Sequence, residues 1–116
     1  MWRVDFYEEE DCSAPVEEFL AKLPKPQRGK ALAVIRLLEE MGPGLPFPYS
    51  SQVRGKIREL RTQYGNEKIR ILYFGDPKRC FILLHGLIKR TDKLHEGDIL
   101  TAGERMNNHN SKLEGG

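Results

Sequence analysis

The sequence predicts an α+β domain in which an N-terminal strand and a helical hairpin pack on a small antiparallel sheet of about four strands, followed by a weak C-terminal helix. Three observations lead to this class. Apolar residues recur with helical spacing over residues 16–41, the period changes to two near residue 52, and tight turns then separate three strand-sized runs. Strands joined by turns this short must run antiparallel.

The first part of the chain predicts one strand and two helices. Residues 2–7 alternate apolar and polar side chains, as a half-buried strand does. Residues 16–23 place apolar side chains on one helical face, and Ser13 is in position to cap that helix. A second helix is expected from near Pro26 to Met41, because Gly42 and the proline after it end a helix.

The second part of the chain predicts strands. Residues 44–51 contain two prolines and are expected to form a stiff loop. Three strands are expected after the loop, at residues 56–63, 68–75 and 79–88. The residues between successive strands have the composition of hairpin turns.

The chain of 116 residues is long enough for one core. We expect residues 1–106 to form a single domain. A helix is expected after Asp92, although Gly97 and Gly103 weaken it. Residues 107–116 have no apolar pattern and predict a disordered tail.

Composition narrows the class of protein. Hydrophobic residues make up 39% and charged residues 31%, which is typical of a globular protein. No apolar run approaches the length of a membrane-spanning helix, so we expect no membrane partner. The two cysteines, Cys12 and Cys80, have no zinc-site spacing, and no metal or other cofactor is expected. A reducing cytoplasm is the default location.

Charge is unevenly distributed along the chain. Residues 1–23 carry seven acids and two bases, whereas residues 57–93 carry nine bases and four acids. A basic middle between acidic ends favours a surface that faces a polyanion. A solvated surface of mixed charge explains the same pattern equally well.

Two arginines occupy strand positions where a cation needs a partner. Arg61 and Arg70 lie in the first two strands of the predicted meander. An unpaired buried guanidinium is costly, so each needs a carboxylate or an exposed concave face. A face lined by such cations suits RNA phosphates. The alternative is that Arg70 forms an ion pair with Glu59 or Glu67 across the hairpin.

Three short motifs lie in the strands of the predicted meander and just after them. Residues 57–61 are similar to the Leu-x-Glu-Leu-Arg motif of a known toxin family, residues 68–74 to its x-x-Arg-x-x-Tyr-Phe motif, and residues 83–93 to its Leu-Leu-His-Gly-Phe-x-Lys-Lys-Thr-x-Lys motif. Over Val4 to Met106 the chain thus resembles the RelE/ParE superfamily of type II toxins, and more closely its HigB-like branch, also called phage-derived Gp49-like. Two features depart from the family pattern: His95 replaces a usual proline, and a C-terminal tyrosine used by some members has no counterpart.

The resemblance implies metal-independent cleavage of ribosome-bound mRNA, which inhibits translation. It implies a cognate helix-turn-helix antitoxin, the ribosome and mRNA as partners. The candidate catalytic residues are Arg61 and Arg70 for phosphate stabilisation, Lys89 as a proton donor, Tyr73 for its hydroxyl and His95 as an exposed base. The candidate RNA-binding residues are Lys56, Arg58, Arg90 and Lys93. His85 lies in an apolar strand and is expected to be structural, and tyrosines in strands usually pack.

Two other functions remain open on this fold. One is inhibition of DNA gyrase without hydrolysis, as in the ParE branch. The other is a catalytically inactive module that binds RNA or an antitoxin. The cations at residues 89–93 favour the nuclease.

Overall fold

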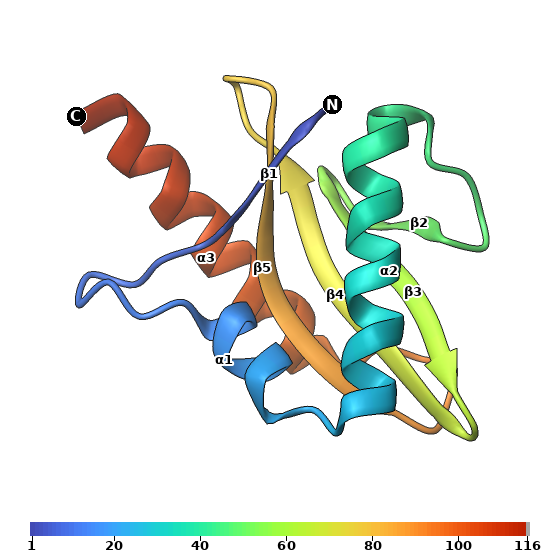
Figure 1. Cartoon of the computed structure of the whole chain (residues 1–116). Coiled ribbons are helices and arrows are strands. Elements are labelled where there is room, and N and C mark those ends of the chain that lie inside the picture. The colour runs from blue at the N-terminus through green and yellow to red at the C-terminus, as the bar shows by residue number, and fades with distance from the viewer. Residues whose placement is uncertain (116) are drawn as a thin grey trace.

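A five-stranded sheet with helices on both of its faces forms the protein in the computed structural model, which describes residues 1–115 (Figure 1). In chain order the elements are β1 (Arg3–Phe6), α1 (Pro15–Lys22), α2 (Lys25–Met41), a short 3-10 helix (Gly42–Gly44), β2 (Ser50–Arg54), β3 (Ile57–Tyr64), β4 (Glu67–Gly75), β5 (Cys80–Lys89) and α3 (Glu96–Gly115). The predicted α+β class is confirmed, and so are the second helix and the three-stranded meander.

The sheet has the strand order β1-β5-β4-β3-β2. The pairs from β2 to β5 are antiparallel, as the tight turns predict. β1 lies at the edge and runs parallel to β5, with Arg3 opposite Cys80. This parallel pair was not predicted, because its partners lie far apart in sequence and no turn connects them.

Side chains of β4 alternate between two apolar layers. Ile69, Ile71 and Tyr73 face α1 and α2 in one buried cluster. Leu72 and Phe74 face α3 in the other. This alternation is the period of two that the sequence shows, and it explains why β4 is buried along most of its length.

The strand β2 and the start of α1 differ from the sequence prediction. Ser50–Arg54 forms the edge strand β2, although the residues before and within it predict a loop. Their own pattern is weakly apolar, so it is the pairing with β3 that orders them. Ser13 also does not cap α1. It donates instead to the Asp11 carboxylate, and Ala14 occupies the cap position.

The predicted disordered tail is helical over residues 107–115, where it continues α3; Gly116 lies outside the described residues. Tertiary contacts account for this order. The His109 imidazole lies 2.9 Å from the Asp76 carboxylate, and Lys112 Nζ donates to the carbonyl oxygen of Glu8. These partners are distant in sequence, so the local pattern does not reveal them.

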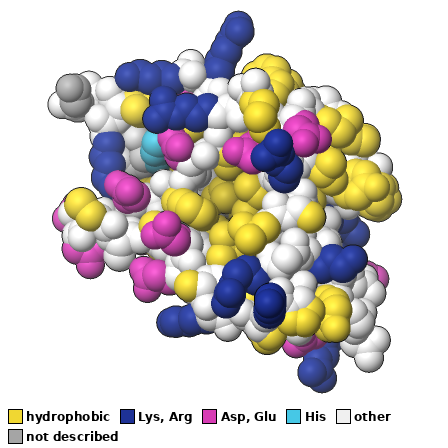
Figure 2. Space-filling view, viewed as in Figure 1, with side chains coloured by type: hydrophobic (Ala, Val, Ile, Leu, Met, Phe, Trp, Pro, Cys, Tyr) yellow, Lys and Arg dark blue, Asp and Glu magenta, His cyan; other side chains and the backbone are white. Residues whose placement is uncertain are grey.

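The face seen in Figure 1 carries α1 and α2, and α3 crosses behind the sheet. Figure 2 shows acidic side chains gathered over the segment between β1 and α1, with hydrophobic side chains in the middle of the face. Lys and Arg side chains lie around this hydrophobic area and at the edge of the face. Within residues 1–115, no helix is long and apolar enough to cross a membrane.

Gly86 in β5 is required by close packing against α1. A Cβ atom added at Gly86 would lie 2.4 Å from Cδ2 of the Phe19 ring, much closer than a van der Waals contact. The glycine therefore lets α1 approach the sheet. A substitution here forces the ring to move within a packed layer.

We expect Gly86→Ala to lower the free energy of unfolding by about 1–3 kcal/mol, the usual cost of overpacking. Urea unfolding followed by circular dichroism measures the change. Gly29→Ala is the matched control, because a Cβ at this exposed position of α2 meets nothing within 4 Å. It should stabilise the helix by up to about 1 kcal/mol. Equal effects of the two variants would contradict the packing argument.

Candidate functional site

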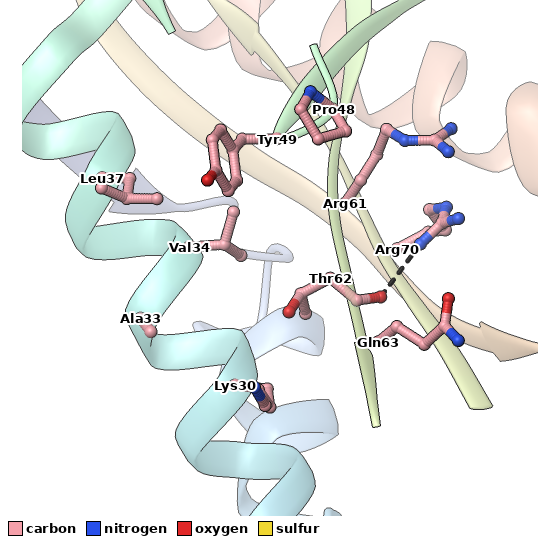
Figure 3. A pocket seen from close by; sticks show the side chains of 10 residues that line it. All are labelled: Lys30, Ala33, Val34, Leu37, Pro48, Tyr49, Arg61, Thr62, Gln63 and Arg70. Carbon is pink, nitrogen blue, oxygen red and sulfur yellow. Dashed lines mark hydrogen bonds between the residues drawn. The ribbon is translucent and has the colours of Figure 1, made fainter. Parts of the chain in front are cut away.

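Four cations from three adjacent strands share the sheet face that points away from α2. They are Arg61 of β3, Lys68 and Arg70 of β4, and Lys89 of β5, which we call the basic cluster. Arg61 is directly opposite Arg70, and Lys68 is directly opposite Lys89. Figure 3 shows Arg61 and Arg70 extending from the strands on the side away from α2. Neighbouring strands thus bring together residues that are 28 positions apart in the chain.

Glu59 of β3 provides the carboxylate at this cluster. Arg61 Nη1 donates to Glu59 Oε2 at 3.3 Å, and Arg70 Nε lies 3.4 Å from Glu59 Oε1. Only 7% of Glu59 is exposed. Within the described part of the chain, Glu59 Oε1 and Arg70 Nε have no hydrogen-bond partner of good geometry. The charges are therefore paired while some hydrogen-bonding capacity is left unused.

Arg70 is the more deeply buried of the two arginines that pair with Glu59. Its exposed fraction is 3%, and Nη1 donates to the carbonyl oxygens of Thr62 and Ile69, both at 3.0 Å. Burial lowers the pKa of Arg70, and the nearby Arg61 charge lowers it further. The ion pair with Glu59 that the sequence offered as an alternative is present. Arg61, with a quarter of its side chain exposed, is the more accessible of the two arginines.

Lys89 ends β5 at the edge of the basic cluster. It is 8% exposed, and its Nζ donates to the carbonyl oxygen of Asp92 at 2.5 Å. Burial lowers the pKa of Lys89, an effect that Glu59 opposes and that Arg70 and Arg61 reinforce. Lys68 forms an ion pair with the Asp92 carboxylate, and this hydrogen bond lowers the pKa of Asp92. An amine with a lowered pKa is better suited to proton transfer than an ordinary lysine.

Tyr73 and Arg58 lie on the opposite face of the sheet. The Tyr73 hydroxyl is 2.7 Å from Ser50 Oγ, and the side chain packs in the layer beneath α2. Arg58 Nε donates to the same Ser50 Oγ at 3.1 Å. The alternation of β3 and β4 separates both residues from the basic cluster. Tyr73 and Arg58, expected from the sequence to be a catalytic and an RNA-binding residue, are therefore not brought together with the basic cluster, because the sheet stands between them and that face.

The remaining sequence candidates are exposed and spread around the cluster. Lys56 lies in the turn between β2 and β3, and Arg90 follows β5 directly. His95 and Lys93 line a separate shallow groove of about 630 Å³ beside Arg54. None of these four side chains takes part in the hydrogen bonds or ion pairs that the structure gives for the four residues of the basic cluster.

His85 is hydrogen-bonded, as the sequence predicted. Its Nε2 is 2.7 Å from an Asp98 carboxylate oxygen, and Arg105 Nη1 donates to its Nδ1 at 3.2 Å. Arg105 also donates to the carbonyl oxygen of Leu84. These contacts hold α3 against β5, which is a structural role.

Phe47 belongs to the site although the sequence analysis placed it only in a stiff loop. The Arg61 guanidinium carbon lies 5.0 Å from the centre of the Phe47 ring, a cation–π contact. The side chain is nevertheless 69% exposed. An aromatic residue between two prolines in a loop was a signal that could have identified it.

A groove between α2 and β3 adjoins the basic cluster. It has a volume of about 360 Å³ and lies between α2 and β3, lined by the apolar side chains Ala33, Val34 and Leu37 together with Tyr49. Arg61 and Arg70 of the basic cluster also line this groove, although Figure 3 shows their guanidinium groups extending to the side of β3 away from α2. Lys30 gives this groove a basic end.

No group of three or more His, Cys, Asp or Glu side chains in the part of the chain that the structure describes is arranged to hold a metal ion. The chain matches a family model described as phage-derived protein Gp49-like (DUF891) over residues 18–107. This range includes α2, the four antiparallel strands and the basic cluster. No curated protein matches the chain.

We expect Arg70→Ala to lower the free energy of unfolding by about 3 kcal/mol, because it leaves Glu59 buried with one partner fewer. Arg61→Ala is the matched control, since it removes the other, more exposed partner of the same carboxylate and should cost less than about 1 kcal/mol. Denaturant unfolding of both variants measures the difference. A larger loss for Arg61→Ala would show that the buried pair is not the structural one.

Proposed function

The chain belongs to the Gp49-like family of phage-derived proteins, a branch of the RelE/ParE-like toxins of toxin–antitoxin modules, and on this premise we propose that it inhibits translation by cutting mRNA on the ribosome. The cleavage proposed is metal-independent and uses the RNA's own 2′-hydroxyl as the nucleophile. The family also indicates an antitoxin as a partner.

The observation that carries the proposal is the basic cluster. Four cations lie on one sheet face, where Arg61 and Arg70 share the buried Glu59 carboxylate and Lys68 pairs with Asp92, so the face has an excess of positive charge. Guanidinium groups match phosphate oxygens in charge and in planar geometry. The exposed part of Arg61 supports contact with an RNA phosphate, while the burial of Arg70 supports a role in positioning Arg61 through Glu59.

The reaction needs three groups around the scissile phosphate. The 2′-oxygen forms a bond to phosphorus, the bond from phosphorus to the 5′-oxygen breaks, and a 2′,3′-cyclic phosphate results. In this proposal Arg61 stabilises the added negative charge on the phosphorane. Lys89 gives its proton to the leaving 5′-oxygen. His95, which is exposed in the groove outside the basic cluster, accepts the proton of the 2′-hydroxyl when the RNA spans both sites. Arg90, Lys93 and Lys56 bind the flanking backbone.

We expect Arg61→Ala to reduce cleavage by about 10²–10³-fold with little change in stability, like the loss of one oxyanion donor. Arg61→Lys should restore only part of the rate, because lysine lacks the bidentate fork. Single-turnover cleavage of mRNA on programmed ribosomes, with purified protein, measures this. Full activity in Arg61→Ala would contradict the assignment. Arg70→Ala should lose both stability and rate, and its activity is compared at a temperature where it is folded.

The pH dependence of the cleavage rate in the same assay tests the role of Lys89. A proton donor acts in its protonated form, so the rate should fall as the pH rises through the lowered pKa of Lys89. Lys89→Arg keeps the charge but should lose this alkaline limb along with most of the rate. Tyr73→Phe is the control, because Tyr73 lies on the other face, and it should keep the wild-type pH profile. An unchanged limb in Lys89→Arg would remove Lys89 from the proton transfer.

The burial of Arg70 favours one other candidate, a module that binds RNA or its antitoxin without cleaving. The two functions differ in one result. RNA bound on programmed ribosomes but left uncut at every pH would establish the second. A loss of both binding and cleavage would remove the proposal for this face altogether.

The antitoxin that we propose is a helix-turn-helix protein with an acidic segment that covers the basic cluster. Opposite charge on that segment would neutralise the face and block RNA. We expect the product of the neighbouring gene to bind in calorimetry, with an affinity that falls as salt is raised. Binding that is absent at micromolar protein, or unaffected by charge reversal at Arg61, would contradict this placement.

A further inference from the structure

Phe47 is a large apolar side chain that the fold leaves in solvent beside the basic cluster. It is 69% exposed, more than any other phenylalanine, tyrosine or tryptophan among the exposed large hydrophobic residues. Its contact with Arg61 accounts for only part of the ring. Because most of the ring stays in solvent, it contributes little hydrophobic stabilisation to the fold. Packing therefore does not explain why this position holds an aromatic residue.

The loop holds Phe47 in a fixed place. Leu45 before it is 3% exposed and Ser50 after it is 1% exposed, so both ends of the loop are anchored in the protein. The N–H groups of Tyr49 and Ser50 both donate to the carbonyl oxygen of Pro46, at 3.0 and 3.1 Å. Prolines on either side of Phe47 restrict the backbone further. An aromatic ring held in this way loses little conformational freedom when a ligand covers it.

The loop is also tied to Arg61 itself. The Arg61 N–H donates to the carbonyl oxygen of Tyr49 at 2.8 Å, and the Arg61 guanidinium lies against the Phe47 ring. The ring and the cation thus form one unit, with a flat apolar surface next to a group that binds phosphate. Single-stranded RNA presents the matching pair, a base and the phosphate attached to its nucleotide.

We propose that Phe47 is a stacking platform for a nucleobase of single-stranded RNA, namely the base adjacent to the phosphate that Arg61 holds. This inference rests on the proposed function, because it takes RNA as the substrate of the basic cluster. The platform adds affinity and fixes the direction in which the strand crosses the face. Every base has a flat aromatic face, so stacking alone does not select one sequence.

A fluorescent base reports stacking directly. The probe is a single-stranded RNA that carries 2-aminopurine and 2′-O-methyl groups, which prevent attack by the 2′-oxygen and so keep the RNA intact. It is used both free and as the mRNA of programmed ribosomes. Stacking on an aromatic ring quenches 2-aminopurine, so we expect the wild-type protein to quench the probe on binding.

Three substitutions at Phe47 distinguish the effect of an aromatic ring from the effect of a large apolar side chain. Phe47→Ala and Phe47→Leu should lose the quench and bind RNA about 5- to 100-fold more weakly, the range for one stacked base. Phe47→Tyr keeps a ring and should keep both the quench and most of the affinity. Tyr64→Ala is the matched control: this exposed tyrosine lies at the end of β3, on the side of the strand away from Arg61, and its loss should change neither reading.

The outcomes distinguish this inference from the proposed nuclease. Quenching that depends on the ring, together with uncut unmodified mRNA, supports the platform and refutes the nuclease. Normal cleavage by Phe47→Ala with unchanged KM overturns the platform and leaves the nuclease standing. A quench retained in Phe47→Leu, or no quench by wild type with either form of the probe, also overturns the platform. A loss of affinity for the antitoxin instead of RNA would show that Phe47 is a protein contact, which overturns it as well.

Discussion

The pairing of the Glu59 carboxylate with the arginines beside it is the interaction on which the candidate site depends. Arg61 and Arg70 stand opposite each other in adjacent strands, where two like charges repel. Glu59 lies 3.3 Å from one and 3.4 Å from the other, and its burial strengthens the attraction. The four cations face two carboxylates, the buried Glu59 and the exposed Asp92, so the face keeps an excess of positive charge that can attract an anion.

One face of the sheet is covered by α1 and α2, whereas the other face carries both an apolar layer and the basic cluster. On one face, α1 and α2 cover Ile69, Ile71 and Tyr73, and Gly86 permits the close approach of α1. On the other face, α3 covers only part of the sheet, packing on Leu72 and Phe74. The basic cluster occupies positions of the same strands that alternate onto this second face. The apolar layers therefore hold the cations at fixed positions without enclosing all of them.

Arg61 links the proposed phosphate contact to the proposed base contact at Phe47. Its backbone holds the loop that carries Phe47, and its guanidinium contacts both Glu59 and the Phe47 ring. A side-chain substitution at Arg61 keeps the backbone hydrogen bond to Tyr49 but removes the contacts with Glu59 and with the Phe47 ring together. Effects of substitutions at Arg61 and Phe47 are not expected to add, because the two residues touch.

The sequence by itself determined the order and type of most elements. Helical spacing fixed α2, and the period of two with short turns fixed β3, β4 and β5, because these signals depend on residues close in the chain. Arg61, Arg70 and Lys89 were also recognised as candidates from their motifs, and Glu59 was one of two carboxylates, with Glu67, that the sequence offered as a partner for Arg70. Tertiary structure decided what depends on distant residues: the parallel place of β1, the strand β2, and the helical order of residues 107–115. It also decided that Tyr73 faces α2, that Arg70 is buried while Arg61 is accessible, and that Phe47 meets Arg61. Side chains of adjacent strands meet according to pairing register and face, and neither is set by the residue types alone.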